Sequence, residues 1–589
     1  MKFVEFVALV AGASAILPAP AADWVSTGAT HWVNNQIGND ETGDGSEANP
    51  YATINKAASI MAKDDIVKIV PGKPYVLTET ITNASSFTAS PEYAHLTFTS
   101  STDERVVIDG NGKCRGMLIG GRGLYFKNLC FTNCVGAATG NGIALGLGNA
   151  DYGWATDKEM WRMGIKVTNC GFYACTNTYD ETNTSAKSPA AFFAKKIIVE
   201  DCDFVDCYGG NSGGAVFSSN SCYEYFTNCT FAGNSAYGMG GAFYSDGYSG
   251  GTRIIDCTFT NNDVRLDANG GYSTGGALRG QFSLINLCRF YCNHAYGGGG
   301  AIYSRAGATY IRNSTFIGNW SEGINWYPGG GAVYFWDGGT VSNCWFESNS
   351  ISNAYGGGVY AKGATFSMQD CTFTNNFASS AGAYYDHGSG NSALARTSRV
   401  ERIRFLRNKA TGYGGAFYSQ PSPLTSRVYL RNCLFAGNSG KQGGAVSLHY
   451  YSGGTALGGM CESCTFAGNA ASTAGGAIYL NRAEYAVTNC LFSGNAKGTT
   501  PNDYYLDTSC EIDLDHCFMS ADGDPKFVNA AAGDYTLCRT SPCANIGVPL
   551  DWMTSATDLR GKPRLSEDGE VDLGCYQFWC RPGLLLFVR

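Results

Sequence analysis

The chain has 589 residues and a formal net charge of −8, with 15% charged and 13% aromatic residues. Disordered chains combine few aromatic residues with high charge, so this composition excludes a disordered chain. The sequence has no block of lysine and arginine, which argues against nucleic acid as a partner. Its 78 glycines favour short strands joined by tight turns.

The N-terminus has the pattern of an export signal. Lys2 is followed by an apolar run from Phe6 to Leu17, and small residues then allow cleavage after Ala21. This run is too short to span a membrane, and no other apolar run reaches that length. We therefore expect a signal peptide at 1–21, no transmembrane segment, and a secreted or cell-surface protein in which disulfides can form.

Residues 22–110 are predicted to form an N-terminal cap and the first coils of a repeating fold. Residues 53–62 read as a short amphipathic helix, with Ile54, Ala57, Ala58 and Met61 on one side. A helix of this kind can cover the exposed strand edges at the end of a solenoid.

From residue 111 to 499 the sequence repeats Cys-x-Phe-x-x-Asn, a variable turn, and Gly-Gly-Ala-aliphatic-Tyr. A clear copy has Cys229, Phe231 and Asn234, followed by 240–244. Cys and Phe are two residues apart and therefore share one face of a strand, whereas glycine pairs would destabilise a helix. The pattern predicts an all-β fold, a right-handed single-stranded parallel β-helix whose interior holds the Cys, Phe and aliphatic side chains.

The Asn of each copy falls at a turn, where it suits a left-handed backbone and where stacked amides can bond to one another. The predicted ladder comprises Asn234, Asn262, Asn293, Asn319, Asn349, Asn376, Asn408, Asn438, Asn469 and Asn495. The repeat Cys is expected to be a small buried hydrophobic residue. Disulfides are more plausible outside this row, with the pairing left open; the candidates are Cys134, Cys175, Cys207 and the close pairs Cys510/Cys517, Cys538/Cys543 and Cys575/Cys580.

Cys461 and Cys464 form a Cys-x-x-Cys pair that resembles a redox motif. The pair lacks the surrounding strand–helix–strand context, and Cys464 belongs to the repeat row. Because no second pair accompanies it, the sequence does not predict a zinc site.

A tyrosine follows the aliphatic residue in many copies. The aliphatic position is always apolar and should face the core, so by alternation the tyrosines should face outward as a row of aromatic rings. This row can stack sugar rings, although the rings can also simply stack on each other. The candidate binding residues are Tyr244, Tyr303, Tyr334, Tyr360, Tyr385, Tyr418 and Tyr479.

The best local candidates for catalysis are Asp386, His387, Arg402 and Arg404. They resemble the His-Gly and Arg-x-Lys elements of polygalacturonases, but the paired aspartates expected upstream are missing and the spacing differs. A polar inserted loop explains these residues more simply. The sequence therefore leans away from an enzyme without excluding one.

Residues 500–589 are predicted to form a final coil and a C-terminal cap. This region is rich in aspartate, and Asp513, Asp515, Asp522 and Asp524 are weak candidates for a calcium site, because hard cations prefer several carboxylates. The spacing of a calcium-binding loop is not met, so a solvated surface is the simpler interpretation. No other cofactor is predicted.

The sequence resembles the secreted right-handed β-helix repeat proteins of bacteria in its opening segments 44–54 and 67–72 and its closing segments 524–527, 533–535, 541–544, 558–561 and 571–576. The Phe-x-x-Asn and Gly-Gly-Ala units resemble the repeats of chlamydial polymorphic membrane proteins, which are autotransported adhesins. Fewer than a hundred residues follow Cys490, too few for the membrane barrel of an autotransporter. The resemblance implies the fold more strongly than a function.

Three functions remain open at this point. A binding or adhesion protein that recognises polysaccharides or cell-surface glycans ranks first, because the repeat is long and no complete catalytic set is found. A passive structural surface protein ranks second. A polysaccharide lyase or glycoside hydrolase on a pectate-lyase-like β-helix ranks third. The oligomeric state cannot be deduced from these patterns.

Overall fold

A computed structural model describes most of the protein, and the predicted signal peptide at 1–21 lies outside the described residues. The described residues contain one α-helix, α1 (Ile54–Ile60), and three short 3-10 helices, and the remaining regular structure is β. No helix among them is long and apolar enough to cross a membrane. The described ranges are 26–83, 94–137, 142–147, 164–178, 188–194, 197–218, 224–246, 251–266, 273–305, 309–323, 329–363, 366–388, 397–420, 427–450 and 456–578.

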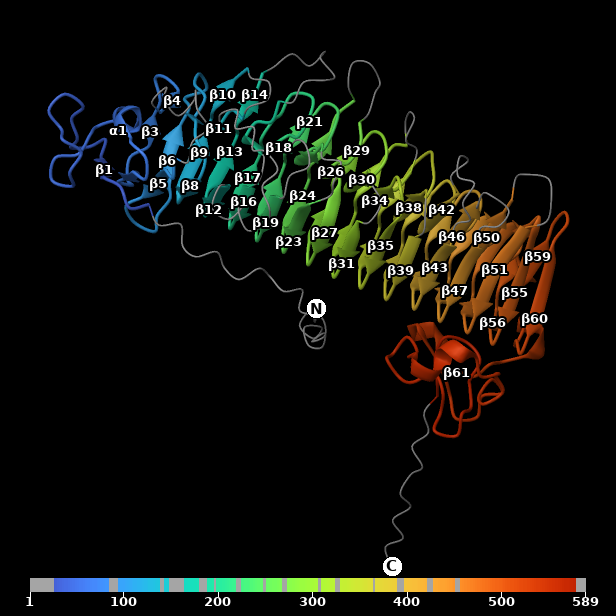
Figure 1. The fold of residues 1–589 in the computed structure, drawn as a ribbon. Coiled ribbons are helices and arrows are strands. Elements are labelled where there is room, and N and C mark those ends of the chain that lie inside the picture. Colours follow the sequence, from blue (N-terminus) through green and yellow to red (C-terminus); the bar gives the residue numbers. More distant parts are fainter. Residues whose placement is uncertain are drawn as a thin grey trace, which may run out of the picture.

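The strands stack into the predicted parallel β-helix, in which each coil adds a strand to each of several sheets (Figure 1). Sheet 1 has 17 strands and sheets 2 and 4 have 15 each, while sheet 3 has 11 short strands. In order along the rod, sheet 1 runs from β1 (Thr30–Val33) to β60 (Glu511–Asp515), sheet 2 from β3 (Tyr75–Val76) to β56 (Leu491–Ser493), sheet 3 from β21 (Ser235–Ala236) to β58 (Thr500–Pro501), and sheet 4 from β4 (Ile81–Thr82) to β59 (Tyr504–Leu506).

A central coil shows how the repeat builds the rod. It consists of β31 (Tyr310–Arg312), β32 (Thr315–Ile317), β33 (Trp320–Ser321) and β34 (Val333–Phe335), each paired in register with the coils on both sides. Phe316, at the centre of β32, is fully buried in the lumen. Its ring lies 4.8 Å from that of Phe290 and 4.7 Å from that of Phe346, nearly parallel to both. The predicted inward phenylalanine column is confirmed.

The predicted asparagine ladder also forms, and its members are buried. Asn319 Oδ1 accepts hydrogen bonds from the backbone N–H and the side-chain amide of Asn293, at 3.1 and 2.9 Å. Its own amide donates to Asn349 Oδ1 and to the Phe290 carbonyl. The left-handed residue at this corner is the preceding one, Gly318 with φ +64°, so the expectation that the ladder Asn itself takes this conformation was wrong.

The repeat cysteines form a second buried row. In this row a cysteine sulfur accepts the backbone N–H of the preceding coil, as the side-chain oxygen does in the asparagine ladder. The Cys344 N–H lies 3.4 Å from the Sγ of Cys371, and the Cys288 N–H donates at 3.1 Å to the hydroxyl of Ser314, the one serine in the row. Burial raises the pKa of Cys371 well above its usual range, so this thiol stays neutral. All 22 cysteines that the structure describes are free thiols, so none of the expected disulfides among them is present.

The glycine pairs are required where neighbouring coils approach each other. Gly299 has a φ of +71°, a left-handed conformation that other residues rarely adopt. A Cβ atom at Gly300 would lie 2.2 Å from the carbonyl oxygen of Gly331 in the next coil. A side chain at the second glycine would therefore separate the stacked coils.

The predicted N-terminal helix is present as α1. Thr53 caps it by accepting a hydrogen bond from the Lys56 N–H, and Ile54, Ala57 and Ala58 are buried. The helix packs against β1, β2 (Ile66–Ile69) and β4 in the first coils. Its role as a cap over the end of the rod stays a prediction.

The C-terminal region lies against the flank of the last coils (Figure 1). It contains β61 (Phe527–Asn529) and β62 (Asp534–Leu537), an antiparallel pair. Leu559, Cys575 and Tyr576 pack on Leu434 and Ala436, which project outward from β48 (Leu434–Ala436) of sheet 2. Asn489 adds hydrogen bonds of 2.7 and 2.8 Å to the backbone of Val548.

Candidate functional site

Five of the seven predicted binding tyrosines form a row on the side of sheet 4 away from the lumen, in a cluster separate from the main core; they are Tyr303, Tyr334, Tyr360, Tyr385 and Tyr418. In the same column, Arg279 separates this row from Tyr244, and Ser447 separates it from Tyr479. The row is covered. Tyr334 stacks between Tyr303 at 4.8 Å and Tyr360 at 4.5 Å. All seven side chains are only 1–6% exposed. The expectation of an open aromatic face is therefore corrected, because second-layer residues such as Tyr355 and Tyr413 pack over the rings.

The four catalytic candidates are not brought together. Asp386 points into the lumen, where Ser398 and Ser419 donate to its carboxylate at 2.6 and 2.7 Å. His387 follows it in β42 (Tyr384–His387) and points to the opposite side, against the rings of Tyr360 and Tyr385. Strand alternation separates this pair, so they cannot act on one substrate.

The two arginine candidates have structural partners elsewhere. Arg402 makes a bidentate pair with Asp370, at 2.7 Å for both bonds, and this hydrogen-bonded pair raises the pKa of the guanidinium. Arg404 donates to the Leu559 carbonyl and so holds the C-terminal region on the rod. These four residues therefore lend no support to the lyase or hydrolase alternative.

The calcium candidates are similarly dispersed. Asp515 contacts His516 at 2.7 Å, while Asp522 and Asp524 each accept a backbone N–H within their own turn. Asp513 lies on the exposed face of β60. Within the described ranges, the only group of three or more potential metal ligands whose ligand atoms lie within 4.8 Å of one another consists of three cysteines. The structure gives the predicted calcium site no support.

A surface cluster on sheet 3 is the best candidate binding site. From β25 (Asp263–Val264) to β53 (Ala470–Ala474) the first residue of each short strand faces outward and the second is buried, so successive coils build a column of outward side chains. Along this column Asp263 pairs with His294, His294 with Trp320, and Trp320 with Ser350. The strands are β25 (Asp263–Val264), β29 (His294–Ala295), β33 and β37 (Ser350–Ile351).

His294 is held between two carboxylates. Its Nδ1 lies 2.6 Å from Asp263 Oδ1, and its Nε2 lies 3.9 Å from Glu322 Oε1. The Nε2 atom is buried and has no hydrogen-bond partner among the described residues. The imidazole is therefore fixed in orientation by one carboxylate, with a second carboxylate beside its other nitrogen.

Trp320 provides the aromatic face of this cluster. Its ring stacks on His294 with centroids 3.6 Å apart, and the residue is 39% exposed. The next residue along the column, Ser350, is too small to stack on the opposite face of the indole. Tyr296 contacts His294 edge-on at 5.0 Å. An exposed indole with carboxylates nearby can stack on an apolar sugar face and accept hydrogen bonds from its hydroxyls.

A cation and two further rings extend the cluster toward the N-terminus. The Arg265 Nε lies 3.7 Å from Asp263 Oδ2, and its guanidinium lies 5.6 Å from the ring of Tyr208. Tyr208 in turn meets Tyr237 edge-on at 5.9 Å. We call these residues the sheet 3 patch; its members are Tyr208, Tyr237, Asp263, Arg265, His294, Tyr296, Trp320 and Glu322.

The sequence carries a signal for the position of this patch. Asp263, His294 and Trp320 each come directly after a ladder asparagine, so the repeat register alone places them in one column. The patch occupies a position whose residue differs from copy to copy, so the repeat pattern itself does not mark it. Trp326 and Tyr327, which follow Trp320 in the sequence, lie outside the described residues.

Comparison with known proteins agrees with the fold. Residues 270–398 match a right-handed β-helix region, and residues 228–246 and 463–481 match the Chlamydia polymorphic membrane protein repeat. No curated protein sequence matches the chain.

Several solved structures match much of the chain at low sequence identity. A mannuronic acid-specific family 6 polysaccharide lyase from human gut microbiota shares 12% identity at a TM-score of 0.34, over 67% of this chain and 82% of that one. Pectate lyase Pel9A shares 10% sequence identity at a TM-score of 0.20, and the match covers 94% of this chain and 97% of that one. A lacto-N-biosidase from Eubacterium ramulus shares 10% sequence identity at a TM-score of 0.18, and the match covers 82% of this chain and 68% of that one. The chain is thus a right-handed parallel β-helix repeat protein with units like those of the Chlamydia polymorphic membrane proteins.

Proposed function

We propose that this protein is a secreted or cell-surface binding protein that holds glycans on the sheet 3 patch. The observation that carries the proposal is the exposed indole of Trp320, which stacks on His294, itself held between the carboxylates of Asp263 and Glu322. A sugar ring has one apolar face and a polar rim, and this arrangement offers a partner for each. The similarity to repeats of a membrane protein family supports a surface location.

The rigidity of the rod supports binding at this patch. Trp320 and His294 sit on paired strands, and the residue that follows each of them, Ser321 and Ala295, is fully buried, so their rings are positioned before a ligand arrives. A site that is already ordered loses little conformational entropy on binding. Repetition of the coil also provides a long surface on which a polymer can make further contacts.

Glycan-array screening of the purified protein, followed by calorimetric titration of the best oligosaccharide, tests the proposal. Trp320→Ala is expected to weaken binding about tenfold or more, because the stacking face is lost. Trp345→Ala is the matched control, since Trp345 is 42% exposed but lies on sheet 2, outside the patch. It should bind like the wild type.

Equal affinities for the wild type and Trp320→Ala would refute the patch as the glycan site. A wild-type protein that binds nothing on a broad array would instead favour the passive structural alternative. Release of unsaturated or reducing sugars from a polysaccharide panel would favour the enzyme alternative.

A further inference from the structure

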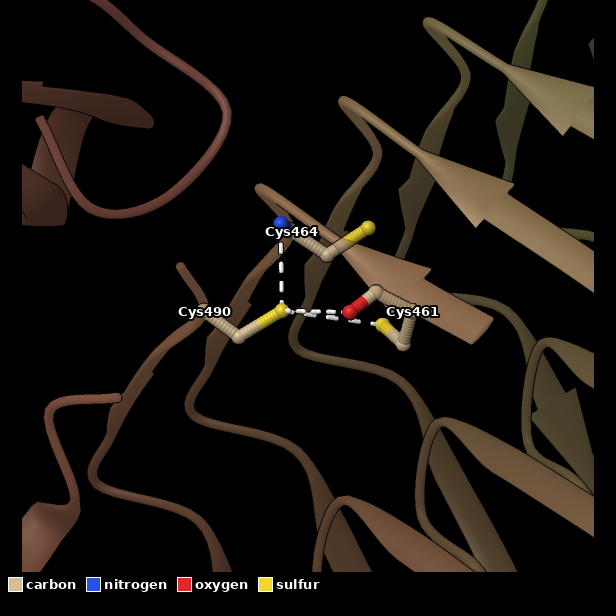
Figure 2. A group of neighbouring side chains, drawn as sticks. All are labelled: Cys461, Cys464 and Cys490. Carbon is tan, nitrogen blue, oxygen red and sulfur yellow. Dashed lines mark hydrogen bonds between the residues drawn. The ribbon is translucent and has the colours of Figure 1, made fainter. Parts of the chain in front are cut away.

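Three cysteines meet in the lumen near the C-terminal end of the rod (Figure 2). Cys461 is in β51 (Ala456–Glu462), Cys464 follows it at the turn into β52 (Thr465–Ala467), and Cys490 follows β55 (Ala483–Thr488) in the next coil. Their sulfur atoms all lie within 4.8 Å of one another, and those of Cys461 and Cys490 are 3.7 Å apart. All three side chains are fully buried.

The cluster arises from one departure from the repeat. Three residues before each row cysteine, the other coils carry an apolar residue that fills the lumen, such as Val341, Leu430 or Val487. Only here is that residue a cysteine, Cys461. It therefore places a third thiol beside two consecutive members of the row, Cys464 and Cys490, and the described residues contain no second group of this kind.

The donor set selects a particular class of metal. It contains sulfur alone, and sulfur donors favour soft ions such as copper(I) over calcium, magnesium or manganese. Three sulfurs around an ion at roughly 2.3 Å stand about 4 Å apart, so shifts of under an ångström would convert the cluster into a trigonal site. Zinc normally takes four ligands in structural sites, and among the residues that the structure describes no fourth ligand atom lies within 4.8 Å of all three sulfurs.

We propose that Cys461, Cys464 and Cys490 form a copper(I) site that fastens two consecutive coils together. Binding by two thiolates and one thiol releases two protons and leaves one net negative charge in the lumen. Because the cluster is buried, the ion enters while the coils fold, and its binding then stabilises the folded rod.

Anaerobic refolding of the full chain with a copper(I) salt tests the site. The wild type should retain about one copper per chain against a competing chelator, with a sulfur-to-copper charge-transfer band in the ultraviolet. Cys461→Val introduces the valine that other coils carry at this position, as at Val487 and Val400, and should bind copper(I) at least tenfold more weakly. Cys344→Ser is the control, because Ser314 already occupies the same row position in another coil. It should keep one copper.

X-ray absorption at the copper edge provides a test that needs no variant. Sulfur neighbours only, at roughly 2.3 Å, are expected. Nitrogen or oxygen ligands, or equal copper retention by the wild type and Cys461→Val, would overturn the site. It would also be overturned if the reduced wild type took up no copper and the protein recovered in air carried a Cys461–Cys490 disulfide.

Discussion

Single buried polar residues control how the stability of the rod responds to pH. Glu224 is fully buried and accepts hydrogen bonds from Ser218 and Thr252. Burial raises its pKa to about 7 despite these bonds. The carboxyl group is therefore protonated in the folded rod at a pH at which it is ionised in the unfolded chain.

Glu224 should make the rod less stable as the pH rises. The raised pKa contributes stability in full below the ordinary value of 4.5, and the contribution is lost as the pH rises through about 7. The loss amounts to about 3 kcal/mol. Glu224→Gln should therefore unfold at nearly the same denaturant concentration at pH 5 and pH 8. The wild type should unfold at a lower denaturant concentration at pH 8 than at pH 5. Glu511→Gln, a control at an exposed position, should show the same pH dependence as the wild type.

His449 should have the opposite pH dependence. Burial against the rings of Tyr413, Tyr418 and Tyr479 lowers its pKa to about 4. Stability from the neutral imidazole is complete above its ordinary pKa of 6.5 and is lost as the pH falls through 4. His449→Phe should reduce the acid sensitivity of the melting temperature between pH 7 and pH 4. An unchanged sensitivity would contradict this assignment.

At the scale of the strands and turns, rows of stacked side chains stabilise each coil more than any single contact does. The side chain of Asn319 makes four hydrogen bonds, which link three coils in a buried corner. Asn319→Ala leaves several buried groups without partners and should lower the free energy of unfolding by roughly 3–5 kcal/mol. Asn343→Gly is the comparison, because it removes an exposed hydrogen bond from the Asn343 side-chain amide to Asn313 and still allows the left-handed backbone at this position. Chemical denaturation should show a much smaller loss for it.

The tyrosine row is expected to stabilise sheet 4 without binding glycans. Tyr334→Ala removes a buried ring between two others and should cost roughly 3–5 kcal/mol of stability. Any glycan affinity measured for the wild type should be unchanged in the folded variant. Loss of binding in Tyr334→Ala but not in Trp320→Ala would restore the tyrosine row as the site.

At the scale of the whole molecule, the C-terminal region should stabilise only the coils that it covers. It buries Leu434 and Leu491 on the outer side of the rod. A solenoid transmits stability mainly between neighbouring coils. Removal of residues 520–589 should therefore accelerate hydrogen exchange in β48 to β56 and leave the coils before residue 300 nearly unchanged. Uniform acceleration along the chain would contradict this local role.

The repeat made the architecture predictable, because spacing and alternation determine which side chains enter the lumen. The phenylalanine column, the asparagine ladder and the helix at 54–60 follow from such local rules. Exposure was not predictable in the same way. Tyr334 lies on the expected side of its strand, yet its accessibility depends on how residues such as Tyr355 pack over the row. The meeting of Cys461 with Cys490 likewise depends on the register between coils.

In-register stacking has one further consequence. Removal of 26 residues from Cys288 to Asn313 would join equivalent positions of adjacent coils, since Cys288 and Ser314 occupy the same place in the repeat. Such a deletion shortens the rod by one step of about 4.8 Å and leaves every other step intact. The length of the rod can therefore be changed only in whole coils.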